Sequence, residues 1–143
     1  MNNLPSNICY TFDIEKNDFT RAGEASSTIK KLLRQLGIDS AIIRRVAIAT
    51  YEAEINIVIH SEGGSITMCA YPLYIQVVVE DKGPGIENIE LAMKEGYSTA
   101  SDAVREMGFG AGMGLSNMKR CSDFFNIESE QGKYTKVTMK INI

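Results

Sequence analysis

A long apolar helix is the strongest structural signal in the sequence. Residues 39–64 read DSAIIRRVAIATYEAEINIVIHSEGG, with Asp39 or Ser40 as an N-cap and Gly63-Gly64 at the end. The roughly twenty residues between these signals are apolar around much of the helical circumference. A helix of this kind is mostly buried, so the rest of the chain has to cover it.

Hydrophobic spacing predicts the remaining elements. Strands are expected at residues 8–15, 65–71 and 73–81, and two more in the tail 124–143 around a turn at Gln131-Gly132. Helices are expected at 19–37, 87–95 and 112–124, with a loop at 96–111. This order predicts one α+β domain over residues 1–143. We expect a two-layer α/β sandwich, with helices on one face of a mixed, mostly antiparallel sheet.

The composition excludes several classes of protein. The net charge is −3 and no basic block is present, so we expect no nucleic-acid partner. No apolar run reaches the roughly 18–20 residues of a membrane span. The first fifteen residues also lack the pattern of a signal peptide. We therefore expect a cytoplasmic protein with no membrane association.

The cysteines give no sign of a disulfide framework or a zinc site. Cys9, Cys69 and Cys121 are an odd number, lie far apart and form no CxxC pair. We expect all three to be small buried residues with free thiols, as in a reducing compartment. Zinc needs clustered ligands, and His60 is the one histidine; we expect it to pack at the end of the long helix.

Two polar residues interrupt the long helix on one side. Glu52 and Asn56 are four residues apart and therefore share a helical face. Asn56 offers an oxygen ligand that suits Mg²⁺, and Glu52 beside it could act as a base. The alternative is a polar pair at the edge of the core that water satisfies. Glu54 lies about 200° around from Glu52, so we expect it on a different, exposed surface.

Glycine-rich turns follow in two places. EDKGPGI (80–86) ends a strand with Asp81 and places Gly83 and Gly85 around a proline. The carboxylate could accept a hydrogen bond from an amino group such as that of adenine, and the glycines would allow close approach. The alternative is an ordinary turn.

The second turn, GFGAGMGL (108–115), leads into a helix, where exposed N–H groups and the helix dipole favour anions. The P-loop pattern is absent, and the alternative for this stretch is a flexible connector.

Three stretches in order resemble the N, G1 and G2 boxes of the GHKL (histidine kinase-like) ATPase superfamily. They are Glu52-x-x-x-Asn56, Asp81-x-Gly83-x-Gly85 and Gly110-x-Gly112-x-Gly114-Leu115. The chain is most similar to bacterial anti-sigma-factor serine kinases and switch-protein kinases, over residues 8–142. The resemblance implies the Bergerat ATP-binding fold, with ATP and Mg²⁺ as cofactors.

The resemblance also implies roles for individual residues. Glu52 would be the general base and Asn56 the Mg²⁺ ligand, while Asp81 would read adenine with Gly83 and Gly85 shaping that end of the site. The ATP lid would cover residues 96–115. The phosphates would lie near Ser98, Thr99, Gly110, Gly112, Met113, Gly114 and Leu115.

Thr135 would support the adenine end of the site. The family's late Gly-x-Gly-Thr turn reads here Gly132-Lys133-Tyr134-Thr135, so a tyrosine replaces the second glycine.

The resemblance implies a serine/threonine protein kinase that acts on a STAS-type (anti-anti-sigma) partner, with a sigma factor as a second candidate partner. Many such kinases carry an arginine just before the G2 glycines, where this chain has Phe109. The alternative is therefore a non-catalytic module that binds ATP and sequesters a sigma factor or another regulator. Simple ATP hydrolysis is a third option. A homodimer is left open as an alternative to a monomer.

Overall fold

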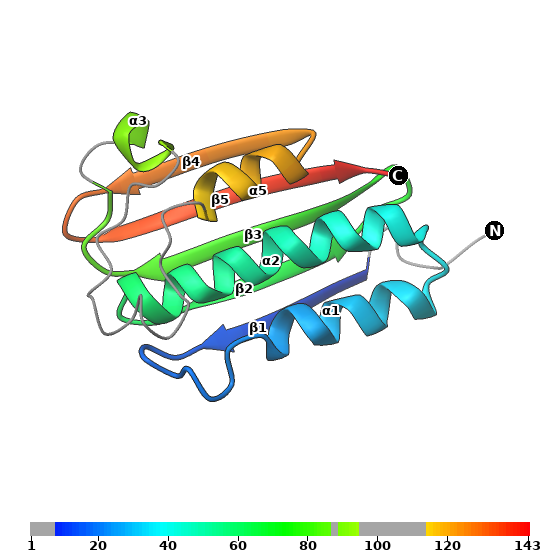
Figure 1. Ribbon diagram of the computed structural model, residues 1–143, viewed down its shortest axis with the longest axis horizontal. Coiled ribbons are helices and arrows are strands. Elements are labelled where there is room, and N and C mark those ends of the chain that lie inside the picture. The colour runs from blue at the N-terminus through cyan, green and yellow to red at the C-terminus, as the bar shows by residue number, and fades with distance from the viewer. Residues whose placement is uncertain (1–7, 87–88, 95–113) are drawn as a thin grey trace.

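The fold has two layers, with helices packed on one face of a five-stranded sheet (Figure 1). The computed structural model describes residues 8–86, 89–94 and 114–143. The strands are β1 (Ile8–Ile14), β2 (Gly64–Ala70), β3 (Tyr74–Lys82), β4 (Phe124–Glu130) and β5 (Tyr134–Asn142). The helices are α1 (Glu24–Gln35), α2 (Ser40–His60), α3 (Ile89–Ala92) and α5 (Gly114–Cys121).

The expected α+β two-layer sandwich is confirmed. The strand order is β1-β2-β3-β5-β4, and all four pairings between described strands are antiparallel, where the sequence left room for a mixed sheet. Within the described part of the chain, no helix combines the length and the apolar character needed to cross a membrane.

Helix α2 lies in the middle of the helical layer, between α1 and α5 (Figure 1). It has neighbours on three sides, which explains why its sequence is apolar around most of its circumference. Of the two expected N-cap residues, Asp39 takes the position, since its carboxylate accepts the Ala41 N–H at 3.0 Å. Strand residues at every second position face these helices and form the core, among them Ile66, Val77 and Met139.

The helix predicted at 19–37 is shorter than expected at its beginning. It begins at Glu24 rather than near residue 19, because Gly23 has a positive φ angle of 100° that a helix cannot include. It ends as expected, with Gly37 at φ 76° just after the last turn. The helix predicted at 87–95 is described only as α3, and the loop predicted at 96–111 lies outside the described residues.

The expectation that Glu54 is exposed is wrong. Its side chain is 1% exposed, because α1 packs against that side of α2. The carboxylate accepts hydrogen bonds from the backbone N–H groups of Ala25 at 3.1 Å and Ser26 at 3.2 Å. These N–H groups belong to the first turn of α1, which has no partner for them within the helix. Glu54 therefore caps α1 from a neighbouring helix.

The expectation of three free thiols is wrong for two of the cysteines. Cys9 and Cys69 lie directly opposite each other in the β1–β2 ladder and form a disulfide, with their Cα atoms 4.1 Å apart. The bond joins the edge strand to its neighbour on the sheet face away from the helices. Cys121, at the end of α5, is the free cysteine and is half-buried.

Candidate functional site

Glu52 and Asn56 lie on the side of α2 that faces α5. Both side chains are half-buried. Gly114, the first residue of α5, packs against both of them. A Cβ at this glycine would lie 3.2 Å from the amide atoms of Asn56 and 3.3 Å from Glu52 Oε2. The structure therefore brings together three of the predicted site residues, and the missing side chain of Gly114 lets α5 begin there.

Helix α5 is held against α2 by contacts along its length. Met118 is 1% exposed and belongs to the core. At the far end, Arg45 Nε donates to the carbonyl oxygen of Cys121 at 3.0 Å, and Arg45 Nη2 lies 3.1 Å from Asp123 Oδ2. A guanidinium at this position satisfies a C-terminal carbonyl and complements the helix dipole. The positive N-terminal end of α5 is thereby held next to Glu52 and Asn56.

Asn117 is a site residue that the sequence did not reveal. Its side-chain Nδ2 donates to Glu52 Oε1 at 3.2 Å, and its Oδ1 accepts from Arg120 Nη2 at 2.7 Å. Residues 117 and 120 are three apart on α5, so their side chains meet. Nothing in the spacing of α2 points to this contact, because the partner lies 65 residues away in the chain.

Asp81 lies near the end of β3 and faces the helical layer. It pairs with Thr135 of β5, whose backbone N–H donates to Asp81 Oδ1 at 3.2 Å. Burial raises the pKa of the Asp81 carboxyl, and the Thr135 N–H partly opposes this by lowering it. On the other side Asp81 pairs with Gly64, where a Cβ would collide with the Asp81 backbone. A carboxylate in this half-buried position is a strong hydrogen-bond acceptor.

The turn after β3 packs against the turn that joins β4 and β5. Gly85 has φ 69°, and a Cβ there would lie 2.5 Å from the carbonyl oxygen of Glu130. Gly132 N–H donates to the Pro84 carbonyl at 2.7 Å, and Gly83 N–H donates to the Lys133 carbonyl at 3.2 Å. In the described structure, these glycines allow close packing of backbone on backbone.

Ser129 connects this turn to Thr135. Its hydroxyl oxygen accepts the Ile86 N–H at 2.8 Å and lies 3.0 Å from Thr135 Oγ1. The sequence did not single out Ser129, which is one of several polar residues on β4. This chain of contacts holds Thr135 beside the turn.

The remaining predicted residues are distributed as follows. Leu115 lies in the first turn of α5 and packs on the core. The other five lie outside the described residues: Ser98, Thr99, Gly110, Gly112 and Met113. His60 is in the last turn of α2 as expected, and burial lowers its pKa.

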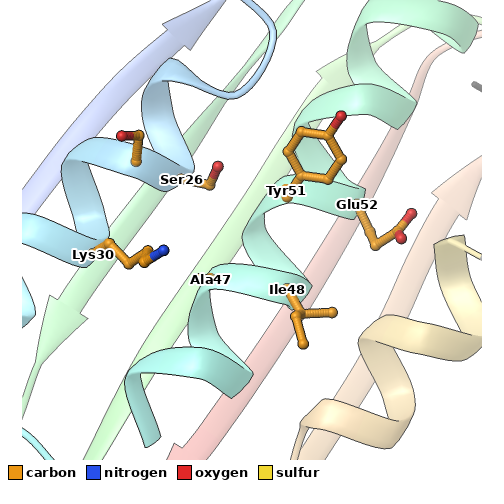
Figure 2. Close-up of a pocket in the computed structure, with 7 residues that line it drawn as sticks. Ser26, Lys30, Ala47, Ile48, Tyr51 and Glu52 are labelled. Carbon is orange, nitrogen blue, oxygen red and sulfur yellow. The ribbon is translucent and has the colours of Figure 1, made fainter. Parts of the chain in front are cut away.

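A pocket of about 360 Å³ lies between α1 and α2 and extends to Glu52. Figure 2 shows Ser26 and Lys30 projecting from α1 toward α2, while Glu52 projects from α2 on the side of α5. Ile48 and Tyr51 line the pocket and are 42% and 39% exposed. The full lining consists of Ser26, Ser27, Lys30, Ala47, Ile48, Tyr51 and Glu52.

The donor set fits a nucleotide with Mg²⁺ better than a metal bound by protein alone. Among the described residues, no group of three or more His, Cys, Asp and Glu side chains is placed to hold a metal ion. Mg²⁺ commonly takes one or two protein oxygens and completes its shell with phosphate and water. Asn56 and the N-terminus of α5 provide a hard oxygen and an anion-binding end at one place.

The chain is similar over most of its length to known proteins of one family. Residues 16–141 match the family model described as "Histidine kinase-like ATPase domain", which places the chain in the class of ATPase domains. The chain is 36% identical to the anti-sigma F factor of Clostridium acetobutylicum over 121 residues, covering 81% of each protein. The chain belongs to the histidine kinase-like ATPase family, and the resemblance to its anti-sigma-factor and switch-protein kinases is confirmed.

Two further comparisons support the assignment. The chain is 28% identical to the serine/threonine-protein kinase RsbT of Bacillus subtilis over 112 residues, which cover 76% of this chain and 78% of that protein. A chain in the crystal structure of the SiaB–SiaC complex from Pseudomonas aeruginosa has the same fold, with a TM-score of 0.61 and 11% identity. The match covers 94% of this chain and 88% of that one.

Proposed function

We propose that the protein is an ATP-dependent serine/threonine protein kinase that phosphorylates a STAS-type antagonist and thereby regulates a sigma factor. The observation that carries the proposal is the meeting of Glu52, Asn56 and the N-terminus of α5 at one place. The names of the relatives, anti-sigma F factor and serine/threonine-protein kinase, support the same function.

Asp81 selects adenine in this proposal. Its half-buried carboxylate accepts a hydrogen bond from the exocyclic amino group, while the Thr135 N–H binds Oδ1 and Gly64 packs closely against the Asp81 backbone. Guanine has a carbonyl oxygen at the corresponding position. This oxygen and the carboxylate oxygen of Asp81 are both acceptors, so no hydrogen bond forms between them. ATP is therefore preferred over GTP, because an unpaired buried acceptor is costly.

The phosphate end of the site is formed by α2 and α5. Asn56 Oδ1 serves as a ligand for Mg²⁺, and the first N–H groups of α5 bind phosphate oxygens. Gly114 lets the backbone come close, since a side chain there would occupy the space next to Asn56. Bound ATP supplies the phosphoryl group for transfer.

Glu52 is the general base for the acceptor hydroxyl. The pocket between α1 and α2 receives the acceptor segment and leads its serine or threonine to this carboxylate. The hydroxyl proton passes to Glu52 as the new O–P bond forms and the bond to the leaving ADP oxygen breaks. The family fold and the pocket thus support a protein substrate that enters from the helical side.

Two experiments test this function. Calorimetry with Mg-ATP and Mg-GTP should give saturable binding of ATP and much weaker binding of GTP. Mass spectrometry of a STAS-domain partner incubated with Mg-ATP should detect one added phosphate, and Glu52→Gln should lower the transfer rate by roughly 100- to 10,000-fold while ATP binding stays. As a control, Glu24→Gln removes one exposed carboxylate from α1 and should leave transfer unchanged. If Glu52→Gln transfers phosphate at the wild-type rate, the proposed base is wrong.

The alternative is a module that binds ATP and its partner without transferring phosphate. The observation that favours it is Phe109, which stands where many such kinases carry an arginine. In that case partner binding depends on ATP, and the partner remains unmodified after prolonged incubation. A cytoplasmic location and a homodimer stay predictions.

A further inference from the structure

The proposed reaction leaves one contact of its base unexplained. Glu52 Oε1 accepts a hydrogen bond from Asn117 Nδ2 at 3.2 Å, and Asn117 Oδ1 in turn accepts one from Arg120 Nη2 at 2.7 Å. The three side chains form a line that runs from the surface of α5 to the face of α2. Glu52 and Asn117 are half-buried, whereas Arg120 is exposed.

The chemistry of the two outer groups leaves one orientation for the amide between them. A guanidinium has donors and no acceptor, so it has to meet the Asn117 oxygen. A carboxylate is an acceptor, so it has to meet the Asn117 nitrogen. The reverse orientation would set donor against donor and acceptor against acceptor. Arg120 therefore determines which end of the Asn117 amide faces Glu52.

Attachment of α5 to α2 does not require this line of contacts. Met118 already anchors the helix in the core, and Arg45 binds its C-terminal end through Cys121 and Asp123. What Asn117 adds is control of one carboxylate oxygen. The hydrogen bond from Asn117 to Oε1 keeps the Glu52 side chain in one rotamer. In this rotamer Oε2 lies near Gly114, the first residue of α5.

We propose that Asn117 is a positioning residue for Glu52, and that Arg120 fixes the orientation of Asn117. The inference rests on the proposed kinase function. Both the phosphate-binding end and the positioning amide belong to α5, so the base is held in a constant relation to the phosphates. A base displaced by about 1 Å loses roughly 100-fold in rate, which is the scale on which such a contact acts.

Steady-state kinetics of phosphoryl transfer test the inference. Asn117→Leu should lower kcat by roughly 10- to 100-fold, with the KM for ATP and the calorimetric ATP affinity within about 2-fold of wild type. Asn117→Asp sets a carboxylate against Glu52 and should lower kcat at least as far. In a Glu52→Gln background, Asn117→Leu should have no further effect, because the group that it positions is gone.

Arg120 is tested by substitutions that keep or remove its donor. Arg120→Lys retains a donor for Asn117 Oδ1 and should keep most of the rate, whereas Arg120→Met should lower kcat. Lys119→Met is the matched control, since it removes one exposed positive charge from the same turn of α5. Equal losses in Arg120→Met and Lys119→Met would mean that charge alone matters, which overturns the role given to Arg120.

A spectroscopic measurement reads the contact without any turnover. The side-chain amide of Asn117 should give a shifted pair of proton–nitrogen NMR peaks, and both Glu52→Gln and Arg120→Met should move them. Peaks that do not move overturn the proposed contact. If the wild-type protein transfers phosphate and Asn117→Leu has the same kcat, the positioning role is wrong and the proposed kinase function stands. If wild type binds ATP but transfers no phosphate, the proposed function fails, and the positioning role falls with it.

Discussion

Glu54 of α2 accepts a hydrogen bond from the backbone N–H of Ala25, in the first turn of α1, at 3.1 Å. The second carboxylate oxygen accepts the next N–H of that turn at 3.2 Å. A buried acidic side chain thus replaces a local cap, because Gly23 at the N-cap position has no side chain. The same turn carries residues of the pocket that leads to Glu52, so this contact also fixes one wall of the pocket.

Replacing Glu54 with alanine should destabilise the fold strongly. Two buried N–H groups lose their acceptor, each at a cost of about 1–3 kcal/mol, so the free energy of unfolding should fall by about 2–6 kcal/mol. Glu54→Gln keeps one acceptor oxygen and should cost less. Urea denaturation measures both. Glu24→Gln, an exposed change at the same helix end, should cost less than about 1 kcal/mol; an equal loss would show that charge near α1 matters rather than the two hydrogen bonds.

Asp81→Asn should separate stability from nucleotide binding. Burial raises the pKa of Asp81, so the folded state binds this proton more tightly than the unfolded state does. Stability therefore decreases as the pH rises from the ordinary aspartate pKa to the raised one, and above that window the charged carboxylate opposes folding. The variant should thus be at least as stable as wild type at pH 7, and its unfolding free energy should vary less with pH at acidic values.

The same variant should lose ATP affinity. The amide can still accept the Thr135 N–H, but its neutral oxygen is a weaker acceptor for adenine, and we expect a loss of roughly 1–3 kcal/mol in binding. Calorimetry and thermal unfolding on one sample give both quantities. A variant that is less stable than wild type at pH 7, yet binds ATP normally, would contradict both parts of the prediction.

Gly85→Ala should cost more than Gly132→Ala. Both glycines have positive φ, 69° and 81°, so each alanine is forced into a left-handed conformation. This lowers the free energy of unfolding by about 1 kcal/mol. At residue 132 a Cβ meets nothing within 4 Å, whereas at 85 it would lie 2.5 Å from the Glu130 carbonyl oxygen. The difference between the two unfolding free energies therefore measures the backbone contact of the turn. Equal losses of unfolding free energy in the two variants would mean that the β4–β5 hairpin shifts to admit the new Cβ at residue 85 without an energetic cost.

Reduction of the Cys9–Cys69 bond should lower the melting temperature. The bond closes a 60-residue separation in the chain, and cross-links over such loops typically stabilise by about 2–4 kcal/mol. Thermal unfolding with and without a dithiol reductant measures the effect, and Cys9→Ser with Cys69→Ser should reproduce the reduced protein. The double variant should then show no response to the reductant.

Thiol labelling followed by mass spectrometry checks the pairing directly. Unfolded, unreduced protein should take up one label, at Cys121, and reduced protein should take up three. In the folded protein the Cys121 label should be slow near neutral pH, because burial raises the pKa of this thiol. Three labels without reduction would exclude the disulfide.

Local chemistry made several elements predictable. The Asp39 cap, the turn at Gly132 and the hairpin of β2 and β3 follow from short-range rules, and the structure confirms each. Residues four apart on a helix share a face, so the neighbourhood of Glu52 and Asn56 was also predictable. Order and spacing of the glycine boxes then indicated the family, which the comparisons confirm.

Other features depend on which elements become neighbours. The angular position of Glu54 relative to Glu52 was correct, but the sequence could not tell that α1 covers that side of α2. Cys9 meets Cys69 only because the β1–β2 register sets them opposite each other. Asn117 meets Glu52 only because α5 packs on α2.

The sequence by itself determined the fold class and the main elements, because periodicity and turn chemistry act over a few residues, and its resemblance to a known family indicated the candidate residues for the nucleotide. Tertiary structure alone decided which carboxylate is buried, which cysteines pair and which amide holds the proposed base. These three contacts join residues between 28 and 65 positions apart, and they form only once the layers have packed.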